Sequence, residues 1–355
     1  MKNWLTVMFL CAAGLVLEGQ SGPAPRVPSI AIRVSETAGI RRNNYPVSTR
    51  IRLAPGQLAD ADHVRLMMNG SEIAGQFAVE STYPDRSVQW LDVDSNVSLG
   101  PREEAALQLE FGPGVTSAVK PRGLAVSRDA TGVQIGNVHT GSSAWPLLTS
   151  VKYRQEDIAT GLNGFTITDV AGVVHDASSG QPPKVDVVKP GPLLAVVRYT
   201  GEISLSPNYS VGYALRVEMP NSKSWVKTTT AIADPQKQVR SMAFHTPLAL
   251  GTQPWTWDFG TTSWSYGIMR DKNDSALLIQ SVGTPQATKW EIKTGPKGQE
   301  QSYETNAAGR SRVAEGWGHI QDQHDERPAR QQESEIPPRI EHEVRAVDAP
   351  QREDE

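Results

Sequence analysis

The chain has 355 residues, enough for two domains that each bury a core of their own. Hydrophobic residues make up 38% of it, and its 30 glycines and 25 prolines are typical of a turn-rich β protein rather than a helical bundle. The formal net charge of −4 comes without a basic patch, which excludes the usual electrostatic basis of nucleic-acid binding.

Residues 1–21 have the pattern of a signal peptide. Lys2 supplies a positive charge, an apolar stretch follows, and the small residues Gly19 and Ser21 offer a cleavage site. The stretch is shorter than the roughly 20 residues that span a bilayer. A buried N-terminal helix is the alternative, but the proline-rich linker at residues 22–28 cannot continue a helix. We therefore predict export to a bacterial periplasm or the cell exterior, with no membrane span in the mature chain.

Cys11 is the only cysteine and lies inside this leader. Because Phe9 and Leu10 precede it where a lipidated cysteine needs a small residue, we predict no lipidation. The mature chain then has no disulfide, thiolate metal site or cysteine nucleophile. The sequence also lacks the glycine-rich phosphate loops and the Gly-x-Ser-x-Gly motif of serine hydrolases, and we predict no cofactor.

The region 29–115 alternates between apolar and polar residues, which is the period of strands with one buried face. Asn69-Gly70 separates two such runs and predicts a tight hairpin. Asp92 and Asp94 share one face of a later run, where we expect solvated carboxylates rather than an acid/base pair. Short strands at regular spacing predict a small barrel or sandwich.

Residues 121–320 resume the alternation and predict a larger antiparallel β-sandwich. Residues 325–355 contain no aromatic residue and no leucine, and 15 of these 31 residues are charged. Such a segment cannot bury enough apolar surface to offset the entropy cost of ordering it, so we predict a disordered tail. The predicted fold is thus all-β: a small barrel, a larger sandwich and a charged tail.

The stretch QPWTWDFGTTSWSYG gathers aromatic residues within a short segment. One interpretation is a glycan-binding platform of Trp255, Trp257, Trp264 and Tyr266, because aromatic faces stack against the C–H faces of sugar rings. The other is a packed core with Phe259, or a cross-strand aromatic ladder. The sequence alone leaves both open.

Two further groups of side chains have less specific patterns. Arg41 and Arg42 stand in a basic, amide-rich loop, where arginines can bind a uronate carboxylate in bidentate fashion or remain solvated. His319, Asp322 and His324 do not have a ligand spacing of a strand or a helix, so we predict no metal site.

Four motifs of the first β region, YPVSTRIRLAPGQL, VRLMMNGSEIAGQF, YPDRSVQWLDVD and LQLEFGPG, occur in a recognisable order. They resemble the N-terminal RIFT-barrel domain of the PcRGLX/YetA-like family, and the resemblance extends more weakly over the second region. Arg86 stands where the family's turn has glycine, which predicts a positive φ there. Trp90, in the following strand, is predicted to be a core residue of the barrel.

The resemblance implies pectin-type polysaccharides, because the family is named after an exo-acting rhamnogalacturonan lyase. In such lyases an α/α toroid carries much of the cleft, and this sequence has no helical stretch long enough to build one. We therefore predict an exported protein that binds or presents rhamnogalacturonan-like glycans without a complete catalytic domain of its own. The alternatives are a polysaccharide lyase or a fragment of one, and a structural or partner-binding module of an export-linked assembly. The oligomeric state is left open.

Overall fold

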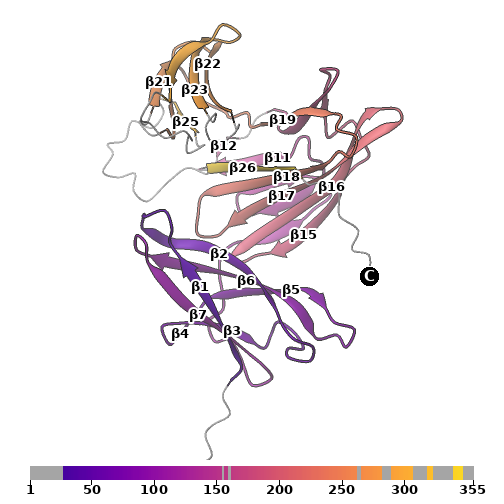
Figure 1. Ribbon diagram of the computed structural model, residues 1–355, viewed down its shortest axis with the longest axis vertical. Coiled ribbons are helices and arrows are strands. Elements are labelled where there is room, and N and C mark those ends of the chain that lie inside the picture. Colours follow the sequence, from indigo (N-terminus) through magenta and orange to yellow (C-terminus); the bar gives the residue numbers. More distant parts are fainter. Residues whose placement is uncertain are drawn as a thin grey trace, which may run out of the picture. The chain divides into compact units, whose positions relative to one another are not determined.

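The computed structural model describes residues 27–153, 156–158, 161–261, 265–281, 289–306, 318–322 and 339–346. In this part of the chain every regular element is a β-strand, so the predicted all-β class is confirmed (Figure 1). The predicted signal peptide and most of the linker after it lie outside the described residues. No helix of the described part is long and apolar enough to cross a membrane.

The chain forms two compact units. The first comprises Met1–Asn43, Ser48–Val93 and Ser98–Lys120, and the second comprises Asn44–Val47, Asp94–Val97 and Pro121–Glu355.

The first unit contains a four-stranded and a three-stranded antiparallel sheet (Figure 1). Its core consists of apolar side chains from alternate strand positions, among them the fully buried Leu66, Leu91 and Leu109. The specific RIFT-barrel closure stays a prediction. In sheet order the strands are β1 Ser29–Ser35, β7 Glu104–Phe111, β3 Val64–Met68 and β4 Ser71–Ile73, then β2 Arg42–Arg52, β6 Val88–Leu99 and β5 Gly75–Thr82.

Both turns predicted from the sequence of the first unit have the expected backbone. Asn69 and Gly70 have φ angles of 51° and 76° and connect β3 to β4. Arg86 has a φ of 69°, as the resemblance predicted. Its amide donates to the carbonyl of Tyr83 at 2.9 Å, and the carboxylate of Asp85 accepts from the amide and the hydroxyl of Ser87. These bonds hold the corner between β5 and β6.

Three side chains of β6 lie in other surroundings than the sequence predicted. Trp90 is half-buried with the guanidinium of Arg52 over its ring at 5.9 Å, so it is not a core residue. Asp92 is buried instead of solvated, and Arg50 donates to it from Nε at 2.7 Å. Asp94 is also buried and belongs to the second unit. The apolar and the polar face of β6 are both covered, which the alternation of one strand cannot reveal.

The second unit is built on a long antiparallel meander. Strands β17 and β18 alternate buried and more exposed residues along most of their length, whereas β16 begins with four buried residues. A parallel strand, β26, pairs with β18 (Figure 1). In sheet order the strands are β15 Lys184–Pro190, β16 Leu194–Ser206, β17 Tyr209–Pro220, β18 Trp225–Ala233 and β26 Arg339–Ala346.

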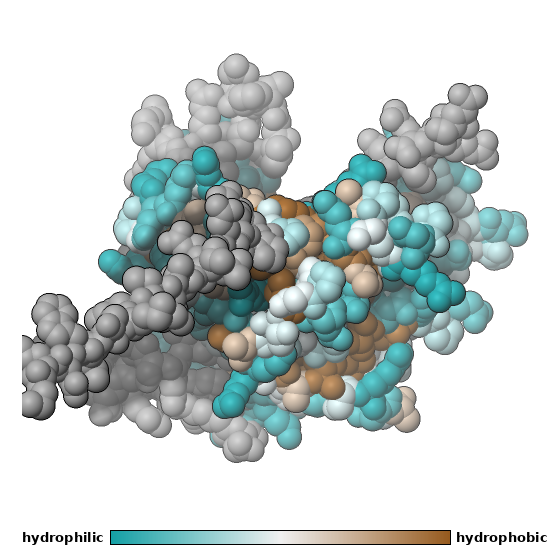
Figure 2. Space-filling view, turned by 90° about the horizontal axis from the view of Figure 1, so that it is seen from below, coloured by the Kyte–Doolittle hydropathy of each residue, from teal (hydrophilic) through white to brown (hydrophobic). Residues whose placement is uncertain are grey.

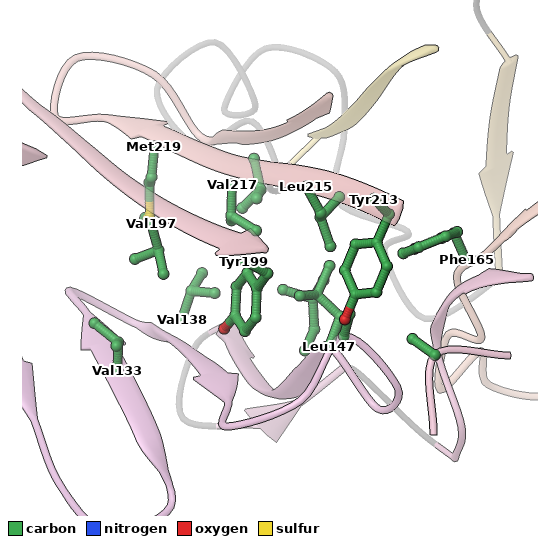
Figure 3. Packing of buried hydrophobic residues seen from close by; sticks show 14 of the residues in the cluster. Val133, Val138, Leu147, Phe165, Val197, Tyr199, Tyr213, Leu215, Val217 and Met219 are labelled. Carbon is green, nitrogen blue, oxygen red and sulfur yellow. The ribbon is translucent and has the colours of Figure 1, made fainter. Parts of the chain in front are cut away.

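Buried side chains of this meander form one core with side chains of two other sheets (Figure 3). Val197 and Val217 contribute from the meander, Val138 and Phe165 from the other sheets, and Leu147 from the position just before β11. One of these has, in sheet order, β12 Glu156–Asp157, β11 Leu148–Tyr153, β10 Val138–Gly141, β9 Gly132–Ile135 and β8 Val126–Arg128, and the other has β14 Val174–Asp176, β13 Gly164–Asp169 and β19 Val239–His245.

Two tyrosines of this core differ in how their hydroxyls are satisfied. Tyr199 donates to the carbonyl of Gly141 at 2.7 Å. The ring of Tyr213 packs edge-on against Phe165 with centroids 5.0 Å apart, and its buried hydroxyl has no hydrogen-bond partner within the described residues (Figure 3). Burial raises the pKa of each tyrosine to about 12, so both hydroxyls are neutral in ordinary buffers.

Two small three-stranded sheets enclose a second core in the same unit. Trp290 is its largest fully buried side chain, and Trp257, Met269 and Ile292 pack with it. In sheet order the strands are β21 Ser265–Met269, β20 Trp255–Phe259 and β25 Gly318–Gln321, then β22 Asp274–Ser281, β23 Lys289–Pro296 and β24 Gln301–Thr305.

The segment predicted to be a disordered tail contains one described element, strand β26. Its residues pair in register with β18, for example Ile340 with Val226 and Val344 with Thr230. Ile340 and Val344 recur with even spacing, which suits a strand, although the composition of the whole segment is that of a disordered chain. The other residues of 325–355 lie outside the described part.

Figure 2 shows one face of the molecule, on which hydrophobic residues gather in the middle and hydrophilic residues surround them. More than half of an ordinary protein surface is contributed by apolar atoms. The hydrophobic residues of this face by themselves therefore do not indicate a function.

Replacing Arg86 by glycine should raise the free energy of unfolding of the first unit by about 0.5–1 kcal/mol. The left-handed backbone conformation costs a residue with a side chain about 1–2 kcal/mol of stability. Glycine avoids this cost, but it loses more conformational entropy on folding, which lowers the stability by about 0.5–1 kcal/mol. Hydrogen exchange of the amides in β6 and β7 measures this stability. The control Arg33→Gly, in the regular strand β1, should lower it, and equal effects of both variants would contradict the prediction.

Tyr213→Phe should leave the stability of the second unit unchanged or raise it by about 1 kcal/mol, because it removes a buried hydroxyl without a partner. Tyr199→Phe should lower the stability by about 1 kcal/mol, because the carbonyl of Gly141 loses its donor. Urea unfolding followed by circular dichroism compares the two variants at an equal m-value. A loss as large for Tyr213→Phe as for Tyr199→Phe would show that the Tyr213 hydroxyl is satisfied in solution.

Candidate functional site

The structure divides the predicted aromatic platform between a core and a surface. Trp257 is 4% exposed and packs against Trp290. Trp255 is half-buried, and its indole N–H donates to the carbonyl of Gly251 at 2.9 Å. Tyr266 is 70% exposed, and Trp264 lies outside the described residues. Of the three predicted platform residues that the structure describes, Tyr266 is the one with a largely exposed side chain.

Strand register explains this division. Trp257 pairs with Gly267 across β20 and β21, whereas Tyr266 pairs with Asp258. Paired residues lie on the same side of a sheet and consecutive residues on opposite sides. Tyr266 and Trp257 therefore face opposite ways, although they are close in sequence and lie on neighbouring strands.

Two glycines make room for the buried rings of β20. A methyl group added to Gly267 would lie 2.5 Å from Cζ2 of Trp257, and one added to Gly318 would lie 2.9 Å from Cε1 of Phe259. The rings thus cover the glycines that pair with them on β21 and β25. Trp257 and Phe259 also contact each other with ring centroids 5.2 Å apart. Glycine rather than a second aromatic residue thus lies opposite each of these two rings, so they do not form the aromatic ladder that the sequence left open.

The outer side of sheet β21-β20-β25 carries a row of three functional side chains. Tyr266, Asp258 and His319 are paired with one another across the three strands. Nδ1 of His319 lies 3.2 Å from Oδ2 of Asp258, and the two side chains are 48% and 23% exposed. We call this surface the Tyr266 face; it comprises Thr256, Asp258, Tyr266, Ile268, His319 and Gln321.

The second row of the Tyr266 face adds apolar and polar groups. Ile268 is 50% exposed, and Thr256 and Gln321 are exposed beside it. Aromatic and aliphatic surface next to a carboxylate, an imidazole and an amide can bind a ligand that has both C–H faces and hydroxyl groups. The sheet is flat in comparison with a pocket, which suits an extended ligand.

Sequence reasoning missed Asp258 and His319 as partners. As a metal ligand, His319 is considered above only together with Asp322 and His324. Asp322 accepts a hydrogen bond from the amide of Gly251 at 2.5 Å, and His324 lies outside the described residues. Within the described part of the chain no group of three metal-ligating side chains could hold an ion. The available signal was the alternation of polar Asp258 between two aromatic residues, but nothing local identifies a strand partner 61 residues away.

The predicted arginines lie in the first unit, whereas the predicted aromatic residues lie in the second. Arg41 is exposed, and Nε of Arg42 lies 3.6 Å from Oε1 of Glu36. Burial of Glu36 raises its pKa, but four backbone N–H groups bind its carboxylate and lower the pKa to about 2. Arg42 therefore stands beside an ionised carboxylate of its own chain.

A second polar cluster of the second unit joins a carboxylate, an imidazole and a hydroxyl. Nε2 of His139 lies 3.4 Å from Oδ2 of Asp129, and its Nδ1 contacts the hydroxyl of Thr149. The register shift between β10 and β11 leaves Thr149 unpaired in a β-bulge, which turns its hydroxyl toward the ring. Because Thr149 also donates to the carbonyl of His139 at 3.2 Å, we interpret the cluster as a brace of the bulge.

Comparisons with known proteins do not identify a family for this chain. No family model matches the chain, and no curated protein matches it. The PcRGLX/YetA-like resemblance therefore stays a prediction that depends on the four motifs of the first unit.

Gly267→Ala should destabilise the small core by about 1–3 kcal/mol, because the added methyl group overlaps the ring of Trp257 and a packed core accommodates extra volume poorly. Thermal unfolding followed by near-ultraviolet circular dichroism of the tryptophans measures the loss. Gly212→Ala, in strand β17, is the matched control, because its φ lies outside the left-handed region and the atom nearest to the added methyl group is Cβ of Ala233 at 3.8 Å, an ordinary contact. A Gly267→Ala variant as stable as the control would contradict the packing.

Proposed function

We propose that the protein is an exported polysaccharide-binding protein and that it binds its glycan with the Tyr266 face. The observation that carries the proposal is the ring of Tyr266, 70% exposed and in one row with the Asp258–His319 pair. The exposed ring supports binding because it lies with the exposed Ile268 and with polar side chains on one surface, so that the Tyr266 face offers both the apolar and the polar contacts that a ligand needs.

The chemistry of the Tyr266 face matches that of a sugar. A pyranose ring has a C–H face that stacks on an aromatic ring and a rim of hydroxyls that need polar partners. The carboxylate of Asp258 accepts hydrogen bonds, and the imidazole of His319 and the amide of Gln321 can donate or accept. Neighbouring strands are about 4.8 Å apart, so the row from Tyr266 to His319 spans about 10 Å and can contact more than one ring of a polymer.

The signal-peptide pattern of residues 1–21 supports export, and the four motifs of the first unit support a pectin-type, rhamnogalacturonan-like glycan. We propose binding or presentation of this glycan rather than its cleavage. In lyases of the resembling family a helical toroid carries much of the cleft, whereas the described residues of this chain are strands, turns and loops.

Tyr266→Ala should weaken binding of the full chain to pectic polysaccharide about tenfold, the factor that corresponds to a loss of about 1.4 kcal/mol of stacking and burial. Isothermal titration calorimetry with soluble pectin fragments measures the affinity. Ile279→Ala is a matched control, because it truncates a 41% exposed apolar side chain of β22 in the neighbouring small sheet. It should bind as the unchanged protein does.

The proposal fails if the unchanged protein binds none of the pectic fragments, or if Tyr266→Ala and Ile279→Ala bind equally well. The same samples are followed by ultraviolet absorbance. A new absorbing product would indicate eliminative cleavage and favour the lyase alternative, since such a reaction leaves an unsaturated sugar.

A further inference from the structure

The Tyr266 face carries little charge, and none of it is a fixed positive charge. On strands β20, β21 and β25 the acidic and basic side chains are Asp258 and His319, and Tyr266 adds a phenol hydroxyl. Their pair has a net charge of −1 when the imidazole is neutral and of zero when it is protonated. In neither state is the pair positive.

The next charged residues along these strands do not alter this balance. Arg270 follows β21 four residues after Tyr266, a separation of about 13 Å along a strand. That exceeds the Debye length of about 8 Å at physiological ionic strength. Asp322 directly follows β25 and adds a negative charge. Among the described residues of these three strands, the row of Tyr266, Asp258 and His319 therefore carries a neutral or negative charge.

Asp258 has one carboxylate oxygen available for a ligand. His319 contacts Oδ2, and within the described part of the chain no donor binds Oδ1. A carboxylate only accepts hydrogen bonds, and sugar hydroxyls donate to it in short, charge-assisted bonds. A uronate offers a second carboxylate at the same place, which is repelled and leaves its own oxygens without donors.

Resting on the proposed function, we propose that the Tyr266 face selects uncharged sugar residues and rejects free uronates, with Asp258 as the residue that determines this specificity. Within a pectin-type polymer the preferred parts are then neutral side chains or esterified backbone, and not the free acid backbone. This narrows the ligand class beyond what the first-unit motifs imply, because those motifs do not distinguish the acidic from the neutral parts of pectin.

The test compares polymers that differ in charge alone. Highly methyl-esterified polygalacturonate and its de-esterified form share one backbone, and a neutral galactan serves as a third probe. At physiological ionic strength the full chain should bind the esterified polymer and the galactan at least tenfold more tightly than the acid form. Added salt should narrow this gap, because it screens the repulsion from Asp258.

Asp258→Asn should bind the acid polymer about tenfold more tightly and the galactan more weakly, which brings the two affinities together. Glu291→Gln is the matched control, since it removes one negative charge from β23 in the neighbouring small sheet. It should leave the ratio of affinities unchanged. Circular dichroism of both variants shows that the fold is retained.

Equal or tighter binding of the acid polymer by the unchanged protein would overturn this inference and leave the proposed function standing. So would an Asp258→Asn variant with the same preference as the Glu291→Gln control. Failure of the proposed function looks different, because then no polymer binds, charged or neutral, and Tyr266→Ala has no effect.

Discussion

The strands of the large core bury apolar side chains on a shared side, and the remainder of the second unit depends on how that side is covered. In β17 and β18 the buried residues recur at every second position, whereas the first four residues of β16 are all buried, and two further sheets supply the opposing surface. A buried valine or leucine contributes about 1.5–3 kcal/mol relative to an exposed one. The same rule on a smaller scale joins sheets β21-β20-β25 and β22-β23-β24 around Trp290.

Three aromatic rings of these cores lie over a glycine of the neighbouring strand. A ring that lies over glycine covers backbone that would otherwise be bare, and the small residue lets the ring approach. The arrangement occurs in both cores of the second unit. The three pairs are Tyr213 with Gly201, Trp257 with Gly267, and Phe259 with Gly318.

Features that depend on a few consecutive residues were predictable from the sequence. The alternation gave the all-β class, Asn69-Gly70 gave a hairpin, and the turn motif gave the positive φ of Arg86. Features that depend on a distant strand were not predictable. Asp94 is paired with Lys189, whose Nζ donates to both of its carboxylate oxygens at 2.8 and 2.7 Å, and only the folded second unit brings these residues together. The candidate site follows the same division, because Tyr266 was identified and its neighbours Asp258 and His319 were not.

The opposite orientation of Trp257 and Tyr266 separates stability from binding in the small sheet. The indole of Trp257 contributes to the core and cannot contact a polymer on the outside, whereas the ring of Tyr266 has little packing to lose. Because consecutive residues of a strand face opposite ways, substitutions on the outer face can alter which ligand is bound while the residues of the inner face keep the core. For the same reason the richness of this segment in tryptophan indicates how the small sheets are held together, and the polar residues between the tryptophans indicate what the surface can bind.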